Sequence, residues 1–238
     1  MQPTLETLRP NALPPNIAAT IATMNLLLEI FTYIVSTVGA LLPIVNPISA
    51  APMLLSITVG IDEEERTRQI RRACVYMFFI LVAFLTAGGL IMSFLGISIP
   101  GLRIAGGLVI NFIGFRMLFP DQQAMSAPEK AEALIKHDIS FTPLAMPGLS
   151  GPGSIAVVIG MSTTAQQSSH VILRHALIAV GIAITAVICY VVLRGATQLA
   201  RILGTNGVNA VSRIMGFLLI CIGVQFVING VLAIVHAA

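Results

Sequence analysis

Three prolines interrupt an apolar stretch that would otherwise form one membrane helix. Pro43, Pro47 and Pro52 lie within residues 31–61, a run without a charged side chain. Each proline removes a backbone N–H and clashes with the carbonyl four residues earlier. A straight helix of this length would span about 45 Å, against about 30 Å of hydrocarbon. Because an unpaired backbone group is costly in hydrocarbon, we expect a broken segment that is buried in protein or lines a wet cavity.

The composition is that of an integral membrane protein. The 238 residues are 56% hydrophobic and 10% charged, whereas soluble domains carry about 25% charged residues. The expected partners are the lipid bilayer and a small-molecule substrate, and nucleic acid is not expected because no basic cluster lies on a soluble surface. Cys74, Cys189 and Cys221 are isolated, fit neither a disulfide framework nor a zinc site, and are expected to pack between helices.

Apolar segments predict six membrane crossings, at about 31–61, 73–95, 102–119, 139–161, 171–193 and 208–234. Residues 1–28 are expected to be an extramembrane extension rather than a signal peptide, and Met24 is a second candidate start. Residues 121–138 form the only long polar loop, which we expect in the cytoplasm.

The second half of the chain repeats the first. Prolines 143, 147 and 152 have the spacing of the first three, and residues 103–106 (RIAG) are echoed by 213–216 (RIMG). The expected fold is an all-α membrane bundle of six transmembrane segments, built as two inverted three-helix repeats (29–120 and 139–238) with broken first and fourth helices. Broken helices at matching positions of inverted repeats point to a transport site near the membrane midplane.

Basic residues predict the orientation, because cytoplasmic loops carry an excess of Lys and Arg. If the amino terminus is outside, three basic residues lie outside (Arg9, Arg103 and Arg174) and ten lie inside. Both termini are therefore expected on the periplasmic side. The ten inside residues are Arg66, Arg68, Arg71, Arg72, Arg116, Lys130, Lys136, Arg194, Arg201 and Arg213.

The two proline-rich breaks supply the candidate substrate-binding residues. A divided helix exposes N–H groups at one end and C=O groups at the other, which suits the carboxylate and ammonium groups of an amino acid. A single break is explained by a simple kink, but a matched pair favours a binding site. The candidates are Asn46, Pro47, Ile48, Ser49, Ser150, Gly151, Pro152, Gly153 and Ser154.

The charged residues narrow the chemistry. Every acidic residue lies outside the expected hydrocarbon core, so a coupling cation, whose identity the sequence leaves open, would be held by carbonyls and hydroxyls. Arg103 and Arg213 occupy paired positions near span ends. Snorkelling or helix-end contacts explain them, and gating or contact with a substrate carboxylate is the alternative. We expect no cofactor and no metal site, and assign the histidines no role.

One motif suggests an enzyme. Residues 148–151 (GLSG) match the GxSG of rhomboid intramembrane serine proteases, and a serine nucleophile needs a base within hydrogen-bond reach. Rhomboids supply a histidine from the sixth helix, whereas here His236 lies past the end of the sixth apolar segment. We therefore expect a protein that is not an enzyme and has no catalytic residue.

Four stretches resemble the MarC family of bacterial inner-membrane proteins, over roughly residues 31–236. The resemblance implies a place in the inner membrane. It also implies kinship with archaeal members described as small neutral amino acid transporters, with inverted repeats and discontinuous first and fourth helices. By that resemblance, the breaks at 46–47 and 151–153 would flank the substrate. The stretches are LLPIVNPISAAP (41–52), GISIPGLRIAGGLVINFIGFRMLFP (96–120), PLAMPGLSGPGSIA (143–156) and SRIMGFLLICIGVQFVINGVL (212–232).

The leading hypothesis is a secondary transporter of small neutral solutes, such as glycine or alanine, that works by alternating access. A second hypothesis is an exporter of drugs or larger metabolites, which would need a wide cavity lined by aromatic or Met side chains. A third is a membrane protein without transport activity, in which the two breaks would pack against each other.

Overall fold

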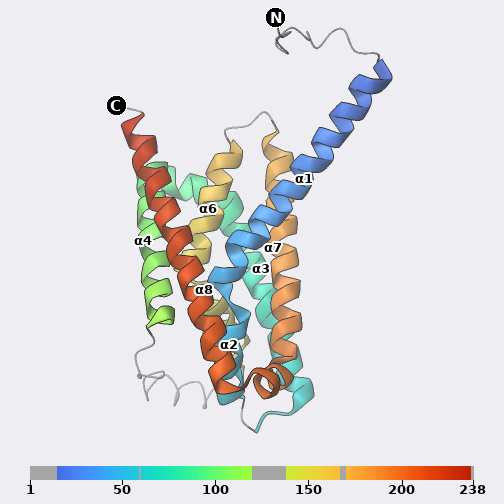
Figure 1. Ribbon diagram of the computed structural model, residues 1–238, viewed down its shortest axis with the longest axis vertical. Helices are drawn as coiled ribbons and strands as arrows, with labels where there is room; N and C mark the ends of the chain where they lie inside the picture. The colour runs from blue at the N-terminus through green and yellow to red at the C-terminus, as the bar shows by residue number, and fades with distance from the viewer. Residues whose placement is uncertain (1–14, 59, 120–137, 167–169, 237–238) are drawn as a thin grey trace, which may run out of the picture.

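The computed structural model describes residues 15–58, 60–119, 138–166 and 170–236. In these ranges every regular element is a helix, and together the helices form one bundle (Figure 1). The first half contains α1 (Pro15–Val45), α2 (Pro47–Ile57), α3 (Glu63–Phe94) and α4 (Ile99–Leu118). The second half contains the π-helical segment η3 (Ser140–Leu149) and the helices α6 (Pro152–Gln166), α7 (Val171–Arg194) and α8 (Ala196–Val235).

Five helical stretches are long and apolar enough to cross a membrane. The remaining predicted segment, near 139–161, is divided into η3 and α6, each too short to cross alone at 1.5 Å per residue. The prediction of an all-helical membrane protein is therefore confirmed, and the sixth crossing stays a prediction. The five stretches are Leu27–Val45, Glu63–Phe94, Ile99–Leu118, Val171–Arg194 and Asn206–Val235.

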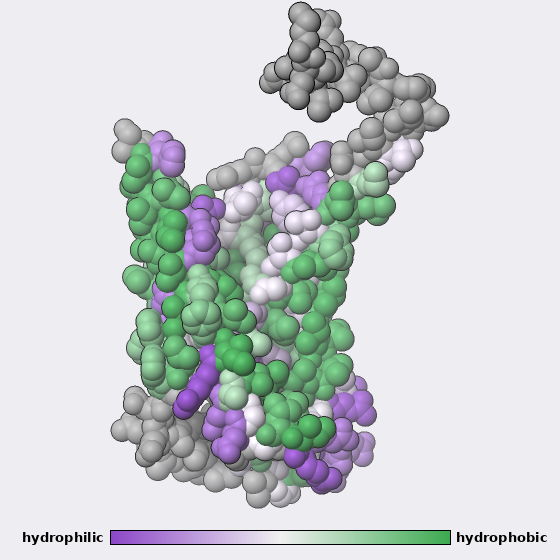
Figure 2. All heavy atoms as spheres, in the orientation of Figure 1, coloured by the Kyte–Doolittle hydropathy of each residue, from purple (hydrophilic) through white to green (hydrophobic). Residues whose placement is uncertain are grey.

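The bundle has two distinct ends. Helix α1 begins and α8 ends at one of them, which we call the terminus end, while α2 and the start of α8 lie at the other, the loop end (Figure 1). A broad apolar band covers the surface between polar groups near the two ends (Figure 2). Both ends of the described chain thus lie on the same side, but which side faces the periplasm stays a prediction.

Acidic residues set the start of α3 earlier than the predicted span at 73. Asp62 caps the helix by accepting a hydrogen bond from the backbone N–H of Glu64 at 3.2 Å, and Glu63, Glu64 and Glu65 fill the first turn. Negative side chains are favoured there because they face the positive end of the helix dipole. Helix α1 also begins earlier than its apolar stretch, which starts at Leu27. Residues 15–28, which the sequence places in the extension, form its first turns. The polar loop at 121–138 lies outside the described residues, except for Asp138.

Helices α4 and α8 approach each other closely enough for glycine to be required. A Cβ atom on Gly107 would lie 2.5 Å from the carbonyl oxygen of Gly223, and one on Gly114 would lie 2.7 Å from that of Gly216. Small residues permit such contact between membrane helices. These glycines therefore permit the close contact between α4 and α8.

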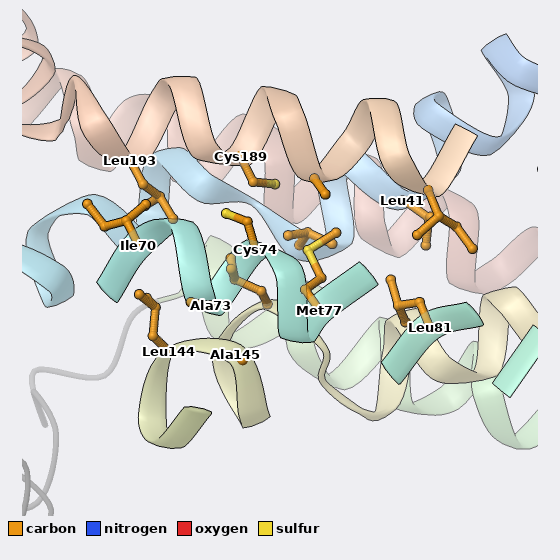
Figure 3. Packing of buried hydrophobic residues seen from close by; sticks show 14 of the residues in the cluster. Leu41, Ile70, Ala73, Cys74, Met77, Leu81, Leu144, Ala145, Cys189 and Leu193 are labelled. Atoms are coloured by element: carbon orange, nitrogen blue, oxygen red, sulfur yellow. The ribbon is translucent and has the colours of Figure 1, made fainter. Parts of the chain in front are cut away.

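The centre of the bundle is a continuous cluster of buried side chains from α1, α3, η3 and α7. Figure 3 shows Met77 and Leu81 of α3 in this cluster, with Leu144 of η3 and Leu193 of α7 also contributing. Two of the cysteines, Cys74 and Cys189, are buried here as free thiols, as expected for packing residues, whereas Cys221 is exposed. This core holds the two broken segments in place.

Candidate functional site

The first break lies at a single residue, Asn46, between α1 and α2. Its φ of 38° and ψ of 68° are left-handed, a conformation that Asn tolerates better than most residues. The helical conformation is disfavoured there because the next residue is Pro47. The other two prolines are accommodated without a break, since Pro43 lies inside α1 and Pro52 inside α2.

The Asn46 side chain caps α2 and begins a chain of hydrogen bonds. Its Oδ1 accepts from the backbone N–H of Ser49 at 3.2 Å, and its Nδ2 donates to the Ser49 hydroxyl at 2.8 Å. The Ser49 hydroxyl is bonded in turn to the hydroxyl of Ser212 on α8. Because Ser212 uses its only hydroxyl proton on the carbonyl of Val208, at 2.8 Å, Ser49 is the donor. The first break is thereby tied to α8.

The second break is more extended. Thr142 and Met146 each precede a proline, and both have extended backbone (φ −123° and −132°) inside η3. The segment ends at Ser150, and α6 begins at Pro152, with the Ser154 hydroxyl donating to the Gly151 carbonyl at 2.9 Å.

Ser150 is the polar residue without a partner at this break. Its side chain is 1% exposed, and its hydroxyl has no hydrogen-bond partner. A buried hydroxyl in this state costs about 1–3 kcal/mol, which a bound ligand or water would offset.

The two breaks meet in the core. A Cβ atom on Gly153 would lie 3.2 Å from Ile44, in the turn before Asn46, and within 3.5 Å of Ile110 and Ile113 on α4. The candidate residues from both halves of the chain are therefore gathered in one region. Whether they bind a substrate stays a prediction.

The two breaks can be aligned by the residues at which their second helices begin or by the spacing of their prolines. The two alignments differ by five residues. Helix α2 begins with Pro47 and α6 begins with Pro152, and each has a serine two residues later (Ser49 and Ser154). The proline spacing pairs Pro47 with Pro147 instead. Proline is favoured in the first turn of a helix, where its missing N–H has no partner to lose, so the helix starts are the better guide.

Beside the breaks, towards the terminus end, lies a cavity of about 350 Å³ that is lined by both polar and apolar side chains. It is open, because Ser36, Thr164 and Asn229 in its lining are exposed. Thr37 on α1 lies about 12 Å along its helix from the first break, and Gly160 on α6 about 9 Å from the second. The polar side chains of the lining are Tyr33, Ser36, Thr37, Arg103, Thr164 and Asn229.

Of the two arginines predicted from the sequence, one lines the cavity and the other does not. Arg103 lines it and donates from Nη2 to the Thr164 hydroxyl at 2.9 Å, whereas Arg213 is exposed on α8. The sequence reasoning missed the cavity residues on α1 and α6. Polar pairs such as Ser36–Thr37 and Thr163–Thr164, about two to three turns from the breaks in otherwise apolar helices, are the pattern that would have found them.

A further polar contact ties three helices together near this cavity. Ser162 on α6 donates to the carbonyl of Leu85 on α3 at 2.7 Å and lies 3.0 Å from Nε2 of His175 on α7. His175, which was given no role, is thus a structural partner of α6. Across the described ranges there is no group of three or more His, Cys, Asp or Glu that could hold a metal ion.

An apolar surface, five membrane-length helices and two buried helix breaks define the chain as a polytopic integral membrane protein. A model of the MarC family of integral membrane proteins matches residues 31–235, so the chain belongs to that family.

The curated relatives agree with this assignment. Proteins named inner membrane protein MarC from Escherichia coli strain K12 and from Shigella flexneri are each 44% identical over 217 residues, which cover 88% of this chain and 98% of each relative. No solved structure matches the chain. The names of these relatives assign the chain to the inner membrane.

Proposed function

We propose that the chain is a secondary transporter of small neutral solutes, with small neutral amino acids such as glycine or alanine as its substrates. The observation that carries the proposal is the meeting of two broken helices in the core, beside an open cavity with an arginine in its lining. Irregular backbone at membrane depth is tolerated where it is buried in protein or lines a cavity, and in transporters it forms the substrate site.

The proposed architecture is six membrane segments in two inverted three-helix repeats, with η3 and α6 together forming the fourth segment. Its support is the reciprocal packing of α4 and α8. Gly107 contacts Gly223 and Gly114 contacts Gly216, so exchanging Gly107 with Gly216 and Gly114 with Gly223 reproduces the same two contacts. Such self-complementary pairing is the mark of two-fold symmetry.

The most extensive of the other helix contacts follow the same exchange. Helix α1 packs on α7 as the η3–α6 pair packs on α3, and α2 packs on α8 as α6 packs on α4. The exchange replaces α3 by α7 and α7 by α3, and these two helices pack on each other. An internal two-fold axis of this kind gives each conformation of the first repeat a counterpart in the second, which is what alternating access requires.

Backbone groups and neutral side chains would bind the substrate. The first turn of α6 contains the N–H groups of Gly153 and Ser154, which have no carbonyl partner within their own helix, and it follows the unpaired hydroxyl of Ser150; a carboxylate suits these donors. The carbonyls that end α1 and η3 suit an ammonium group. The close approach of Ile44 to Gly153 leaves room for a small substrate only.

In this conformation the two ends of the proposed pathway differ. The bond between Ser49 and Ser212 holds α2 against α8 towards the loop end, while the cavity opens on the other side of the breaks. Alternating access would break the contact between Ser49 and Ser212 and close the cavity. We propose no catalytic role, because the described histidine nearest in sequence to Ser150, His170, lies beyond the far end of α6 and His175 is bonded to Ser162.

One observation favours the drug-exporter alternative. An apolar groove of about 390 Å³ runs between α3 and α7 and is lined by Phe78, Phe79 and Tyr190. Its outward position, with Phe79 63% exposed, is equally explained by contact with lipid. The close packing of Gly153 on Ile44 favours the third alternative, a protein without transport activity.

Uptake and efflux by purified protein in proteoliposomes distinguish the three. The proposal predicts flux of labelled glycine and alanine, little flux of leucine, and loss of flux in Asn46→Ala and Gly151→Leu variants that remain folded. Transport of a bulky aromatic drug without any glycine flux would favour the exporter. No flux of either would favour the third alternative.

A further inference from the structure

The cavity beside the breaks holds a positive charge that nothing in its described lining neutralises. Arg103 is half-buried there, and no acidic residue belongs to the described lining. Its guanidinium has five N–H donors, arranged in a fork that fits a carboxylate, and the contact with Thr164 uses only one nitrogen. Most of its hydrogen-bonding capacity therefore faces a ligand or solvent.

The other charges near the cavity cancel. Arg174 on α7 pairs with Glu29 on α1 at 3.1 Å, and its guanidinium lies over the ring of Tyr33, 5.2 Å from the ring centre. Tyr33 itself lines the cavity. Because this pair is neutral as a unit, the sign of the field in the cavity is set by Arg103.

The cavity also offers neutral polar groups on the helices around the charge. Ser36 and Thr37 on α1 and Asn229 on α8 line the same space as Arg103 on α4. Its volume of about 350 Å³ falls within the range of small-molecule sites, although it is larger than glycine needs. Five helices thus surround a site with one cation, several hydroxyl groups and one side-chain amide, together with apolar side chains such as Ile178 and Phe226.

We propose that this cavity is a carboxylate-binding vestibule, separate from the breaks, in which Arg103 binds the carboxylate of an incoming amino acid. The ligand reaches the vestibule from the terminus end and then passes about 10 Å along α1 and α6 to the breaks. The identification of the ligand as an amino acid rests on the proposed transport function. The positive field does not, because it follows from Arg103 alone.

The test measures charge selectivity in the cavity without requiring transport. In a background with Cys74, Cys189 and Cys221 changed to Ala, a Ser36→Cys variant in detergent is labelled with anionic or cationic methanethiosulfonate reagents. We expect Arg103→Gln to lower the ratio of anionic to cationic labelling by about three- to tenfold, as removal of one nearby charge should. Arg103→Lys, which keeps the charge, should preserve the ratio.

Arg213→Gln is the matched control, since this arginine lies outside the cavity, and it should leave the ratio unchanged. Acetate and glycine should slow labelling at Ser36→Cys, whereas glycinamide, which lacks the carboxylate, should not. An Asn229→Cys variant provides a second labelling position on another helix, should the first prove poorly folded.

A labelling ratio that Arg103→Gln leaves unchanged at both positions would overturn the proposal, as would failure of the anionic reagent to react at both positions. Failure of both acetate and glycine to slow labelling would also overturn it. If glycine flux is absent while acetate slows labelling in an Arg103-dependent manner, the proposed transport function fails and the carboxylate site stands.

Discussion

The hydroxyls of Ser49 and Ser212, 163 residues apart in the chain, are hydrogen-bonded to each other across α2 and α8. Ser49 also receives a hydrogen bond from Asn46, and Ser212 donates one to the carbonyl of Val208, so four groups form a directed chain. This chain links the break of the first segment to the last helix. Its polar groups lie in an otherwise apolar contact, where each depends on its neighbour for a partner.

Removing either hydroxyl should weaken the contact between α2 and α8. Ser49→Ala and Ser212→Ala should show a coupling energy of about 0.6 kcal/mol in a double-mutant cycle, the typical value for side-chain hydrogen bonds inside membrane proteins. The measurement is unfolding in mixed detergent micelles. Ser56→Ala is the control, because that exposed hydroxyl bonds only to the Met53 carbonyl of its own helix. Strictly additive single effects would show that the bond does not hold the two helices together.

The backbone conformation at the first break should make Ala worse than Gly at position 46. Asn46→Ala loses the cap of α2, worth about 0.5–2 kcal/mol, and leaves at a left-handed φ an alanine, for which this conformation costs about 1–2 kcal/mol compared with glycine. Asn46→Gly also loses the cap, but glycine adopts the left-handed conformation without that further cost. Chemical unfolding of both variants should therefore rank wild type above Gly and Gly above Ala. Equal stability of the two variants would contradict the left-handed break.

The close contact of α4 and α8 should make Gly107→Ala destabilising. The added Cβ would lie 2.5 Å from a backbone carbonyl oxygen, and overpacking of this kind costs about 1–3 kcal/mol. Gly39→Ala is the matched control, since nothing lies within 4 Å of its Cβ position on α1. The control should be neutral, or more stable by about 0.5–1 kcal/mol through helix propensity. Similar effects of both substitutions on the free energy of unfolding would argue against the packing.

An ionisable side chain at the start of η3 should make the stability of the fold depend on pH. The hydroxyl and N–H of Ser140, and then Arg72 at 3.2 Å, hold the pKa of Asp138 below its ordinary value of 3.8. A lowered folded-state pKa stabilises the fold above the ordinary value, and this contribution is lost as the pH falls through the lowered value. Thermal unfolding should therefore find Asp138→Asn less stable than wild type at pH 7, with the difference starting to shrink near pH 4 and lost as the pH falls through the lowered pKa. A difference that is constant with pH would contradict the pairing.

Much of the fold follows from composition and proline placement. The apolar segments predict the helices closely, because in hydrocarbon a helix is the only way for a single segment to pair its own backbone groups. The exception is the region at 139–161, where η3 and α6 replace a single span. Local residues do explain that outcome, since Thr142 and Met146 each precede a proline, but apolar content alone does not reveal it.

The site was predictable only in part. The local sequence predicts the breaks at Asn46 and at residues 150–154. Their correct alignment with each other follows from the residues at which α2 and α6 begin, and not from the spacing of the prolines. The cavity depends on side chains from five helices, among them Arg103 of α4 and Asn229 of α8. No local pattern brings these two residues together. They converge because glycines hold α4 and α8 in close contact, which is a property of the packed bundle.

The most direct test of the account is counterflow of labelled glycine into proteoliposomes preloaded with unlabelled glycine, because exchange needs no knowledge of the coupling ion. The account predicts rapid counterflow in wild type and in the Gly39→Val control. It also predicts loss in a folded Gly153→Val variant, whose side chain would fill the space beside Ile44 and Ile113. Absence of counterflow in folded wild type for glycine and alanine, or equal counterflow in both variants, would contradict it.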